Sequence, residues 1–295
     1  MTRNQHLPTA FELLAKGSFQ RGLDQLALDD RWNDLSETLD GPFYLGFPHD
    51  PGGWGEGLLL ASLLKRHAVR SRRSISVCAA PHVCSILKHD AAFSIKSTGG
   101  RPPLAILKSA LLGDLLQLGF ERVRSGRIQS KKKNRMRVGV AWASVSNTGP
   151  IKEKSVCPFE FLSILQNIDA DVVSFQRGLA VDESKIPSNR LNAIITDKLL
   201  HDPDQTAVVQ EITNLDCMLS VSTTTAHIAA CLGVPVILLV AKRKGQQWFW
   251  RIQADNRVCI YPHVDVVLGG RGKRWWDDCL PRAKRSLVAR LNRPS

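Results

Sequence analysis

The fold of this chain is decided by residues 219–240, LSVSTTTAHIAACLGVPVILLV. An apolar run ends at the hydroxyl-bearing residues 222–225, small residues follow as far as Gly233, and residues 236–240 are apolar on both faces. The pattern predicts a strand, a helix with hydroxyls at its start and glycine at its end, and a buried parallel strand. Free N–H groups and the helix dipole make such a start an anion site. The alternative is an ordinary cap on a packing helix, with His227 a hydrogen-bonded core histidine.

The composition indicates a soluble globular protein. The chain has 295 residues, enough for one large domain or two of ordinary size, and is 43% hydrophobic and 23% charged. No apolar run approaches the roughly 18 residues that span a bilayer, and the N-terminal MTRNQHLPTA lacks the apolar core of a signal peptide. The 7 cysteines form no CxxC pair, so we expect neither a metal site nor a disulfide framework. A reducing cytoplasm fits this composition best.

The net charge is +13, which suits a phosphate-bearing ligand, an acidic polymer or a membrane surface. The run at 131–135, KKKNR, would also suit nucleic acid. It lies between two patterned regions, however, and we interpret it as a solvated linker. No aromatic stripe interleaves with the basic residues and no nucleic-acid-reader motif is present, so we expect no nucleic-acid partner.

Short apolar runs alternate with helical patterns in both halves of the chain. In the first half we predict strands at 45–47, 74–79 and 93–95, helices at 58–64 and 82–89, and a buried helix or loop-helix segment at 104–118. In the second half we predict strands at 137–142, 172–175 and 192–195, and helices at 158–167, 204–214 and 281–291, with Asp204 as the N-cap of the second of these helices.

This alternation predicts an α/β protein with two Rossmann-like domains that face one another across a cleft. We expect a helical N-terminal segment over 1–40, a first domain over 41–130 and a second over 135–295. The boundary between the domains is expected at the basic run, near 125–135.

A glycine-rich turn at 49–57 connects a predicted strand to a predicted helix in the first half. Such a turn lets a ligand approach the backbone closely. It matches neither the P-loop pattern nor the dinucleotide fingerprint. Glu56, at the helix start, is either a carboxylate that stabilises the helix dipole or a base held at the edge of a cleft.

Several motifs follow one another in the second half: VGVAW at 138–142, VSFQRG at 173–178, DQTA at 204–207, NLD at 214–216, SVSTTTAHIA at 220–229, LGVPV at 232–236, and Trp248, Trp250-Arg251 and Tyr261-Pro262. Each is weak alone. In this order and spacing they resemble the catalytic domain of the heptosyltransferase-like glycosyltransferases (glycosyltransferase family nine), especially the branch fused to tetratricopeptide repeats.

The first half resembles the family less closely. GWGE at 53–56 stands at the family's Gly-x-Gly-Asp turn, and residues 11–30 resemble part of one tetratricopeptide repeat. The resemblance covers roughly residues 45–265.

The resemblance implies a GT-B fold and an inverting, metal-independent sugar transfer without a cofactor. The donor would be a nucleotide-diphosphate sugar, with heptose as one candidate sugar. The acceptor would be a glycan, a lipopolysaccharide or a protein, and peripheral membrane association would fit such an acceptor.

The resemblance also implies roles for individual residues. Glu56 stands where the family has its aspartate and would be the catalytic base. A helix N-terminus and a basic side chain can replace a divalent cation at a diphosphate leaving group. The donor-binding residues would therefore be Thr223, Thr224, Thr225 and Lys154 (or Lys152) at the diphosphate, with Ser222, Gln176 and His227 near the nucleotide and sugar.

The sequence departs from the family pattern at three places. Glu56 replaces an aspartate, Ser222 stands where many members carry an aspartate that contacts the donor, and the loop 144–155 lacks the usual arrangement around its basic residue. These departures keep a second interpretation open, a degenerate GT-B module that binds a sugar or a partner without catalysis.

Overall fold

The computed structural model divides the chain into two units. The first comprises Met1–Arg124, Gln247–Arg251 and Cys259–Pro262, and the second Ser125–Gln246, Ile252–Val258 and His263–Ser295. The residues that the structure describes are 21, 43–45, 55, 57–59, 61–62, 64–65, 74–90, 92–95, 135–144, 154–177, 193–195, 200, 202, 204–241, 250, 261, 263–270 and 274–291. The helical segments predicted at 104–118 and, apart from helical Arg21, over 1–40 fall outside them.

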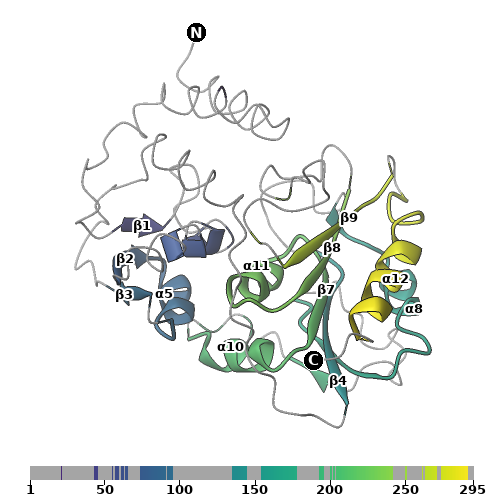
Figure 1. The fold of residues 1–295 in the computed structure, drawn as a ribbon, viewed down its shortest axis with the longest axis horizontal. Coiled ribbons are helices and arrows are strands. Elements are labelled where there is room, and N and C mark those ends of the chain that lie inside the picture. Colours follow the sequence, from purple (N-terminus) through teal and green to yellow (C-terminus); the bar gives the residue numbers. More distant parts are fainter. Residues whose placement is uncertain are drawn as a thin grey trace. The chain divides into compact units, whose positions relative to one another are not determined.

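The first unit contains a small parallel sheet with the strand order β1-β2-β3 (Figure 1). Its elements are β1 (Phe43–Leu45), β2 (Ile75–Ala79), α5 (Pro81–Leu87) and β3 (Phe93–Ile95). The predicted strands at 74–79 and 93–95 and the helix near 82–89 are confirmed, whereas β1 begins two residues before the predicted 45–47. The described residues between 55 and 65 are helical and bury Leu58, Leu59, Ala61 and Leu64.

The second unit contains a parallel sheet with the order β6-β5-β4-β7-β8-β9. The strands are β4 (Met136–Ala141), β5 (Ala170–Ser174), β6 (Ala193–Ile194), β7 (Cys217–Val221), β8 (Val236–Val240) and β9 (Val264–Leu268). Counted from β4 along the chain, this is the order 3-2-1-4-5-6 of a Rossmann sheet. The order reverses between the neighbours β4 and β7, so their carboxyl ends mark the point where such sheets bind ligands. The α/β class with parallel sheets is confirmed.

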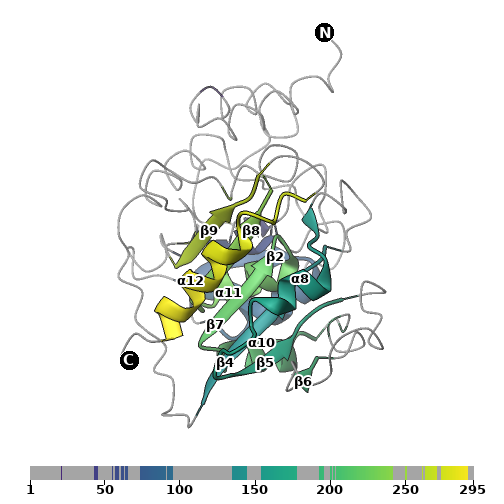
Figure 2. The same ribbon diagram turned by 90° about the vertical axis from the view of Figure 1, so that its right-hand side faces the viewer.

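Helices cover both faces of this sheet. Figures 1 and 2 show α8 (Pro158–Ser163) and α12 (Leu280–Leu291) on one face, and α10 (Thr206–Thr213) and α11 (Thr224–Cys231) on the other. Alternate strand residues point to each face, because side chains in a strand alternate. Under α8 and α12 they form one apolar core with the helices, whose members include Val138, Val140, Leu219, Val221, Ile237, Leu239, Phe161, Leu162, Ala283 and Leu287.

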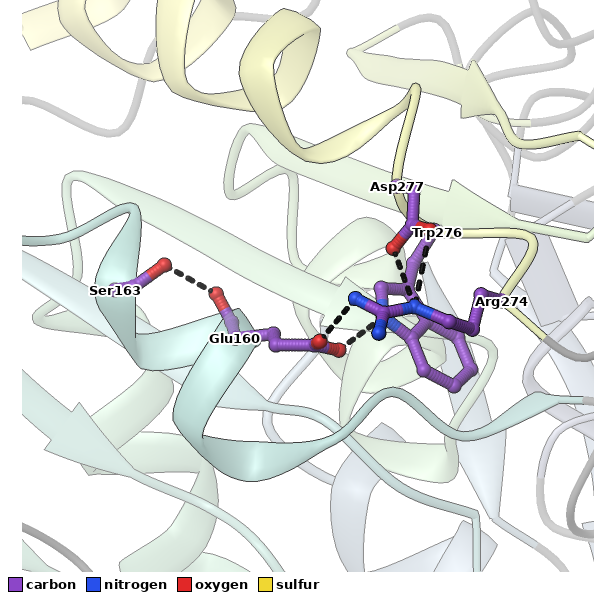
Figure 3. A network of polar contacts seen from close by, with 5 residues as sticks. All are labelled: Glu160, Ser163, Arg274, Trp276 and Asp277. Atoms are coloured by element: carbon purple, nitrogen blue, oxygen red, sulfur yellow. Dashed lines mark hydrogen bonds and ion pairs between the residues drawn. The ribbon is translucent and has the colours of Figure 1, made fainter.

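A polar cluster joins α8 to the segment that precedes α12 (Figure 3). Glu160 accepts hydrogen bonds from Arg274 Nη2 at 2.5 Å and from the indole N–H of Trp276. Arg274 Nε also donates to Asp277, at 3.0 and 3.1 Å to the two carboxylate oxygens, and Ser163 Oγ donates to the Glu160 carbonyl at 2.7 Å. The Arg274 side chain is 65% exposed, so the cluster orients the two segments and contributes little to stability.

Three details differ from the sequence-based expectations. The helix predicted at 158–167 ends at Ser163, and turns lead from there to Asn167, which has φ 63°. Asp204 was wrongly predicted as an N-cap: the N-cap of α10 is Gln205, and Asp204 Oδ1 accepts from Thr206 N at 3.0 Å just before the helix. Strand β9 was not predicted at all.

In the part of the chain that the structure describes, no helix is long and apolar enough to cross a membrane. Within the same residues, no group of three or more His, Cys, Asp and Glu side chains has the geometry to hold a metal ion.

Candidate functional site at the start of α11

The stretch that decides the fold forms the predicted elements. All residues of β7 and β8 are buried, and α11 lies between them in the chain. Thr223 is the N-cap, with extended backbone, and its Oγ1 accepts from Ala226 N at 3.2 Å. The prediction of a hydroxyl cap at this position is confirmed.

The end of α11 is the predicted glycine. Gly233 has φ 81°, a conformation that costs glycine little and other residues more. Its N–H donates to Ala230 O at 3.2 Å, and Val234 N–H donates to Ala229 O at 2.9 Å. This pair of bonds is a Schellman motif, which provides hydrogen-bond donors for the last carbonyls of the helix and directs the following residues into β8.

A directed chain of hydroxyls lies behind the start of the helix. Ser220 is fully buried and its Oγ donates to Val221 O at 2.7 Å, so its single proton is used. In the 3.0 Å contact between Ser220 Oγ and Thr223 Oγ1, Thr223 must therefore be the donor. The contact of 3.0 Å between Thr223 Oγ1 and Thr225 Oγ1 then requires Thr225 to donate.

This order of donors decides which groups remain available to donate a hydrogen bond to an anion. The hydroxyl protons of Thr223 and Thr225 point into the protein and are not available to a ligand. Among the described residues the Thr224 hydroxyl makes no hydrogen bond, and its side chain is partly exposed. The first N–H groups of an α-helix have no intrahelical acceptor, so the N–H groups of Thr224 and Thr225, beside that hydroxyl, have no partner within the helix.

Lys154 contributes a positive charge close to α11. Burial, and secondly the charge of Lys154, lower the pKa of His227 to about 3, so the imidazole is neutral at pH 7. His227 lies in the second turn of α11 and is 4% exposed. Lys154 belongs to the segment after β4, and His227 to the helix after the neighbouring strand β7. These two predicted site residues therefore lie near enough for the charge of Lys154 to act on His227, and each follows one of the two strands between which the sheet order reverses.

Gln176 follows β5 and is 3% exposed. Its Oε1 accepts from Trp142 N at 2.9 Å and from Ala143 N at 2.8 Å. Its Nε2 donates to Ala143 O at 3.0 Å and to Arg177 O at 2.9 Å. An amide offers two donors and two acceptor sites, so the backbone uses all four. The Gln176 amide therefore has a structural role in the protein, which the predicted contact with a sugar donor would not by itself explain.

Two further hydrogen bonds tie the segment around Lys154 to the end of β4. Val156 N donates to Trp142 O at 2.8 Å, and Ser144 N donates to Ser155 Oγ at 3.3 Å. Both ends of the polar loop that begins after β4 are thereby held together, although residues 145–153, with Lys152, lie outside the described residues.

The other predicted site residues have different outcomes. Ser222 is buried at the end of β7, directly before the N-cap. Glu56 lies outside the described residues, between Gly55 and Gly57, which are both helical. Its role as a base stays a prediction.

Sequence reasoning missed two residues of this site. Ser220 anchors the hydroxyl chain, and its signal was a hydroxyl inside an otherwise apolar buried strand. Ser155 holds the segment next to Lys154, and no sequence pattern singled it out.

Comparisons with known proteins add a resemblance in structure. No family model matches the chain, and no curated protein matches it significantly in sequence. The structure of E. coli ADP-heptose LPS heptosyltransferase II is similar with a TM-score of 0.49 and 13% identity, over 82% of this chain and 96% of that one. A glycosyl transferase of family 9 from Veillonella parvula is similar with a TM-score of 0.36 and 10% identity, over 75% of this chain and 68% of that one.

Proposed function

We propose that the chain is a glycosyltransferase of the GT-B fold that transfers a sugar from a nucleotide-diphosphate donor, with inversion and without a metal, to a glycan, lipopolysaccharide or protein. The observation that carries this proposal is the start of α11, where the Thr224 hydroxyl makes no hydrogen bond among the described residues and the first N–H groups have no acceptor within the helix. The site lies where the strand order reverses between β4 and β7, and Lys154 lies close to it.

The chemistry of a diphosphate leaving group fits this site. Negative charge develops on the phosphate as the sugar departs, and fixed donors stabilise such charge best where they need not reorganise. The N–H groups of Thr224 and Thr225 are held by the helix, and the Thr224 hydroxyl stands beside them. The helix dipole adds partial positive charge at the same place.

The electrostatics of the site also favour an anion. Lys154 lies close enough to His227, in the second turn of α11, for its charge to lower the imidazole pKa, and His227 stays neutral. A phosphate bound there would be attracted both by the Lys154 ammonium and by the positive end of the α11 dipole. In the proposed enzyme the acceptor hydroxyl loses its proton to Glu56, the residue that the family resemblance assigns as base.

Ser222 favours a second candidate, a GT-B module that binds without catalysis. It stands at the end of β7, where many members of the resembling family carry an aspartate that contacts the donor. A protein that has lost this contact and the family's aspartate at position 56 would still bind a diphosphate through the helix backbone. Binding without turnover distinguishes this candidate from the enzyme.

The first experiment is a thermal-shift screen with ADP-, GDP- and UDP-sugars on the full chain. A ligand present at a hundred times its Kd adds about 2.7 kcal/mol to the free energy of unfolding, which raises Tm by roughly 5–10 °C in a protein unit of this size. Lys154→Met, which removes the charge and keeps the length of the stem, should reduce the shift. Absence of any shift in the wild-type protein would contradict both candidates.

The second experiment measures sugar transfer with and without EDTA, in the wild-type protein and in Glu56→Gln. Glutamine keeps the shape of the side chain but cannot accept the proton, so turnover should fall by roughly 100- to 10,000-fold while donor affinity barely changes. Activity abolished by EDTA and restored by manganese would refute metal independence. Near-normal turnover in Glu56→Gln would refute the assignment of the base.

A further inference from the structure

The buried amide of Gln176 shows how the site around Lys154 is held. It makes three hydrogen bonds to the backbone of Trp142 and Ala143, the two residues that follow β4, and a fourth to Arg177 O. It therefore fixes both the course and the orientation of the peptide that leads into the polar loop. Few other side chains can replace it, because the site needs two acceptor and two donor positions together.

The same backbone holds the segment that carries Lys154. Trp142 O accepts from Val156 N at 2.8 Å, and Ser144 N donates to Ser155 Oγ at 3.3 Å. Ser155 is the neighbour of Lys154 in the chain. A continuous series of hydrogen bonds thus leads from Gln176 through residues 142–144 to Ser155, and the ammonium of Lys154 lies close enough to His227 to act on its protonation.

We infer that Gln176 is a positioning residue: its amide fixes the backbone after β4, and this backbone holds Lys154 at the anion site beside α11. The inference rests on the proposed function for the identity of the ligand, a diphosphate. The hydrogen bonds that lead from Gln176 to Ser155 do not depend on the proposed function. It assigns Gln176 an effect on diphosphate binding that acts through Lys154 and requires no contact with the ligand.

The binding experiment is a double-mutant cycle with inorganic pyrophosphate as the probe, measured by calorimetry on the full chain. Lys154→Met should weaken binding roughly 10- to 100-fold, the usual value of a hydrogen bond to a charged group. Gln176→Met, which keeps the volume and removes all four hydrogen bonds, should cause a similar loss. The double variant should bind within about twofold of Lys154→Met alone, because the two residues act in one series.

A matched control separates positioning from a general loss of stability. Gly233→Ala destabilises the protein at the opposite end of α11, where no residue of the site lies. It should bind pyrophosphate as the wild-type protein does. If the fold losses of pyrophosphate affinity in Gln176→Met and Lys154→Met multiply in the double variant, the two residues act independently and the inference is overturned. A loss of affinity in Gly233→Ala equal to that in Gln176→Met would also overturn it.

A second measurement needs no ligand. The ring of His227 senses the charge of Lys154, so its ¹H–¹³C NMR signal, assigned by its loss in His227→Gln, should move in the same direction in Lys154→Met and Gln176→Met. A signal that moves in Lys154→Met but stays at its wild-type position in Gln176→Met overturns the inference. If the wild-type protein does not bind pyrophosphate, the proposed function fails, and the His227 signal still decides the role of Gln176.

Ser155→Ala keeps the test decisive if Gln176→Met does not fold. It removes the hydroxyl that accepts from Ser144 N, in the residue next to Lys154. The His227 signal should move in the direction seen in Lys154→Met, and pyrophosphate affinity should fall without a further loss when Lys154→Met is added. An unmoved signal and unchanged affinity in Ser155→Ala would overturn the series of contacts.

Discussion

Replacement of Thr223 by alanine should destabilise the second unit far more than the same replacement at Thr224. Thr223 Oγ1 accepts from Ala226 N at 3.2 Å and from the Thr225 hydroxyl at 3.0 Å, and donates to Ser220 Oγ at 3.0 Å. Alanine removes all three bonds. Thr224 has no hydrogen bond from its hydroxyl among the described residues, although it is the next residue of the same helix.

The magnitude follows from these bonds. Loss of an N-cap hydroxyl costs about 1–2 kcal/mol. Thr225, which is 4% exposed, is also left with a hydroxyl proton that must find another acceptor, and Ser220 loses one donor. We therefore expect the free energy of unfolding to fall by about 2 kcal/mol in Thr223→Ala and by less than about 0.5 kcal/mol in Thr224→Ala. In a unit of this size the larger value lowers Tm by roughly 4–8 °C.

Urea denaturation followed by tryptophan fluorescence measures the difference, with Thr223→Ser as the matched control. Serine keeps the hydroxyl and its three partners, so its stability should lie within about 0.5 kcal/mol of the wild-type protein. An m-value that stays constant across the variants shows that the substitutions change the free energy of unfolding and not the surface exposed on unfolding. Equal stability of Thr223→Ala and Thr224→Ala, or equal loss in Thr223→Ser and Thr223→Ala, would refute the hydroxyl chain.

Three more predictions follow from the same helix. Thr224→Val should weaken pyrophosphate binding and leave the free energy of unfolding within about 0.5 kcal/mol, because its hydroxyl faces outward; unchanged affinity in calorimetry would contradict this. Gly233→Ala should cost about 1–2 kcal/mol in urea denaturation, since alanine is strained at φ 81°, whereas Gly233→Asn should cost less. His227 takes up a proton below about pH 6.5 when unfolded but only near pH 3 when folded. Stability should therefore fall as the pH drops through this window, by up to about 1.4 kcal/mol per pH unit, and His227→Gln should flatten the curve.

The sequence predicted the second unit well wherever a local signal fixed the element. The apolar strands β7 and β8, the cap at Thr223 and the glycine at 233 all follow from patterns within a few residues. Strand β9 was missed because it lies at the edge of the sheet, where Asp265 is exposed and the apolar run is broken. Its neighbours Pro262 and the glycines at 269–270 were the available boundary signals.

The N-cap of α10 shows the limit of such signals. Asp204 has the right side chain for a cap, but it accepts from the N–H of Thr206, the first residue of the helix. Gln205 takes the cap position without a side-chain hydrogen bond to the helix N–H groups, and its amide donates to Asp202 O instead. Gln205 is itself buried, so tertiary packing decides where the helix begins. A rule based on side-chain preference alone cannot include that packing.

At the candidate site, the sequence indicated which residues gather but not what each one does. Lys154 and His227 lie 73 positions apart, counted as 227 − 154, and meet because β4 and β7 are neighbours. The order of donors among Ser220, Thr223 and Thr225 depends on one bond, from Ser220 to Val221 O. Nothing in the sequence gives that bond, so the three threonines looked equivalent before the structure separated them.

The different roles of the three threonines help to interpret Ser222, one of the departures of the sequence from the family pattern. Under the proposed function the diphosphate is bound mainly by backbone N–H groups of α11, and a backbone site depends on the helix being capped and in place. Ser222 precedes the cap and makes none of the bonds that hold Thr223 to Ser220, Thr225 and Ala226. Under the proposed function we therefore expect the serine at this position to affect which sugar is preferred, or whether one is transferred, without disturbing the proposed anion site. Substitutions at different residues can then change diphosphate affinity and transfer activity independently, so each quantity has to be measured separately.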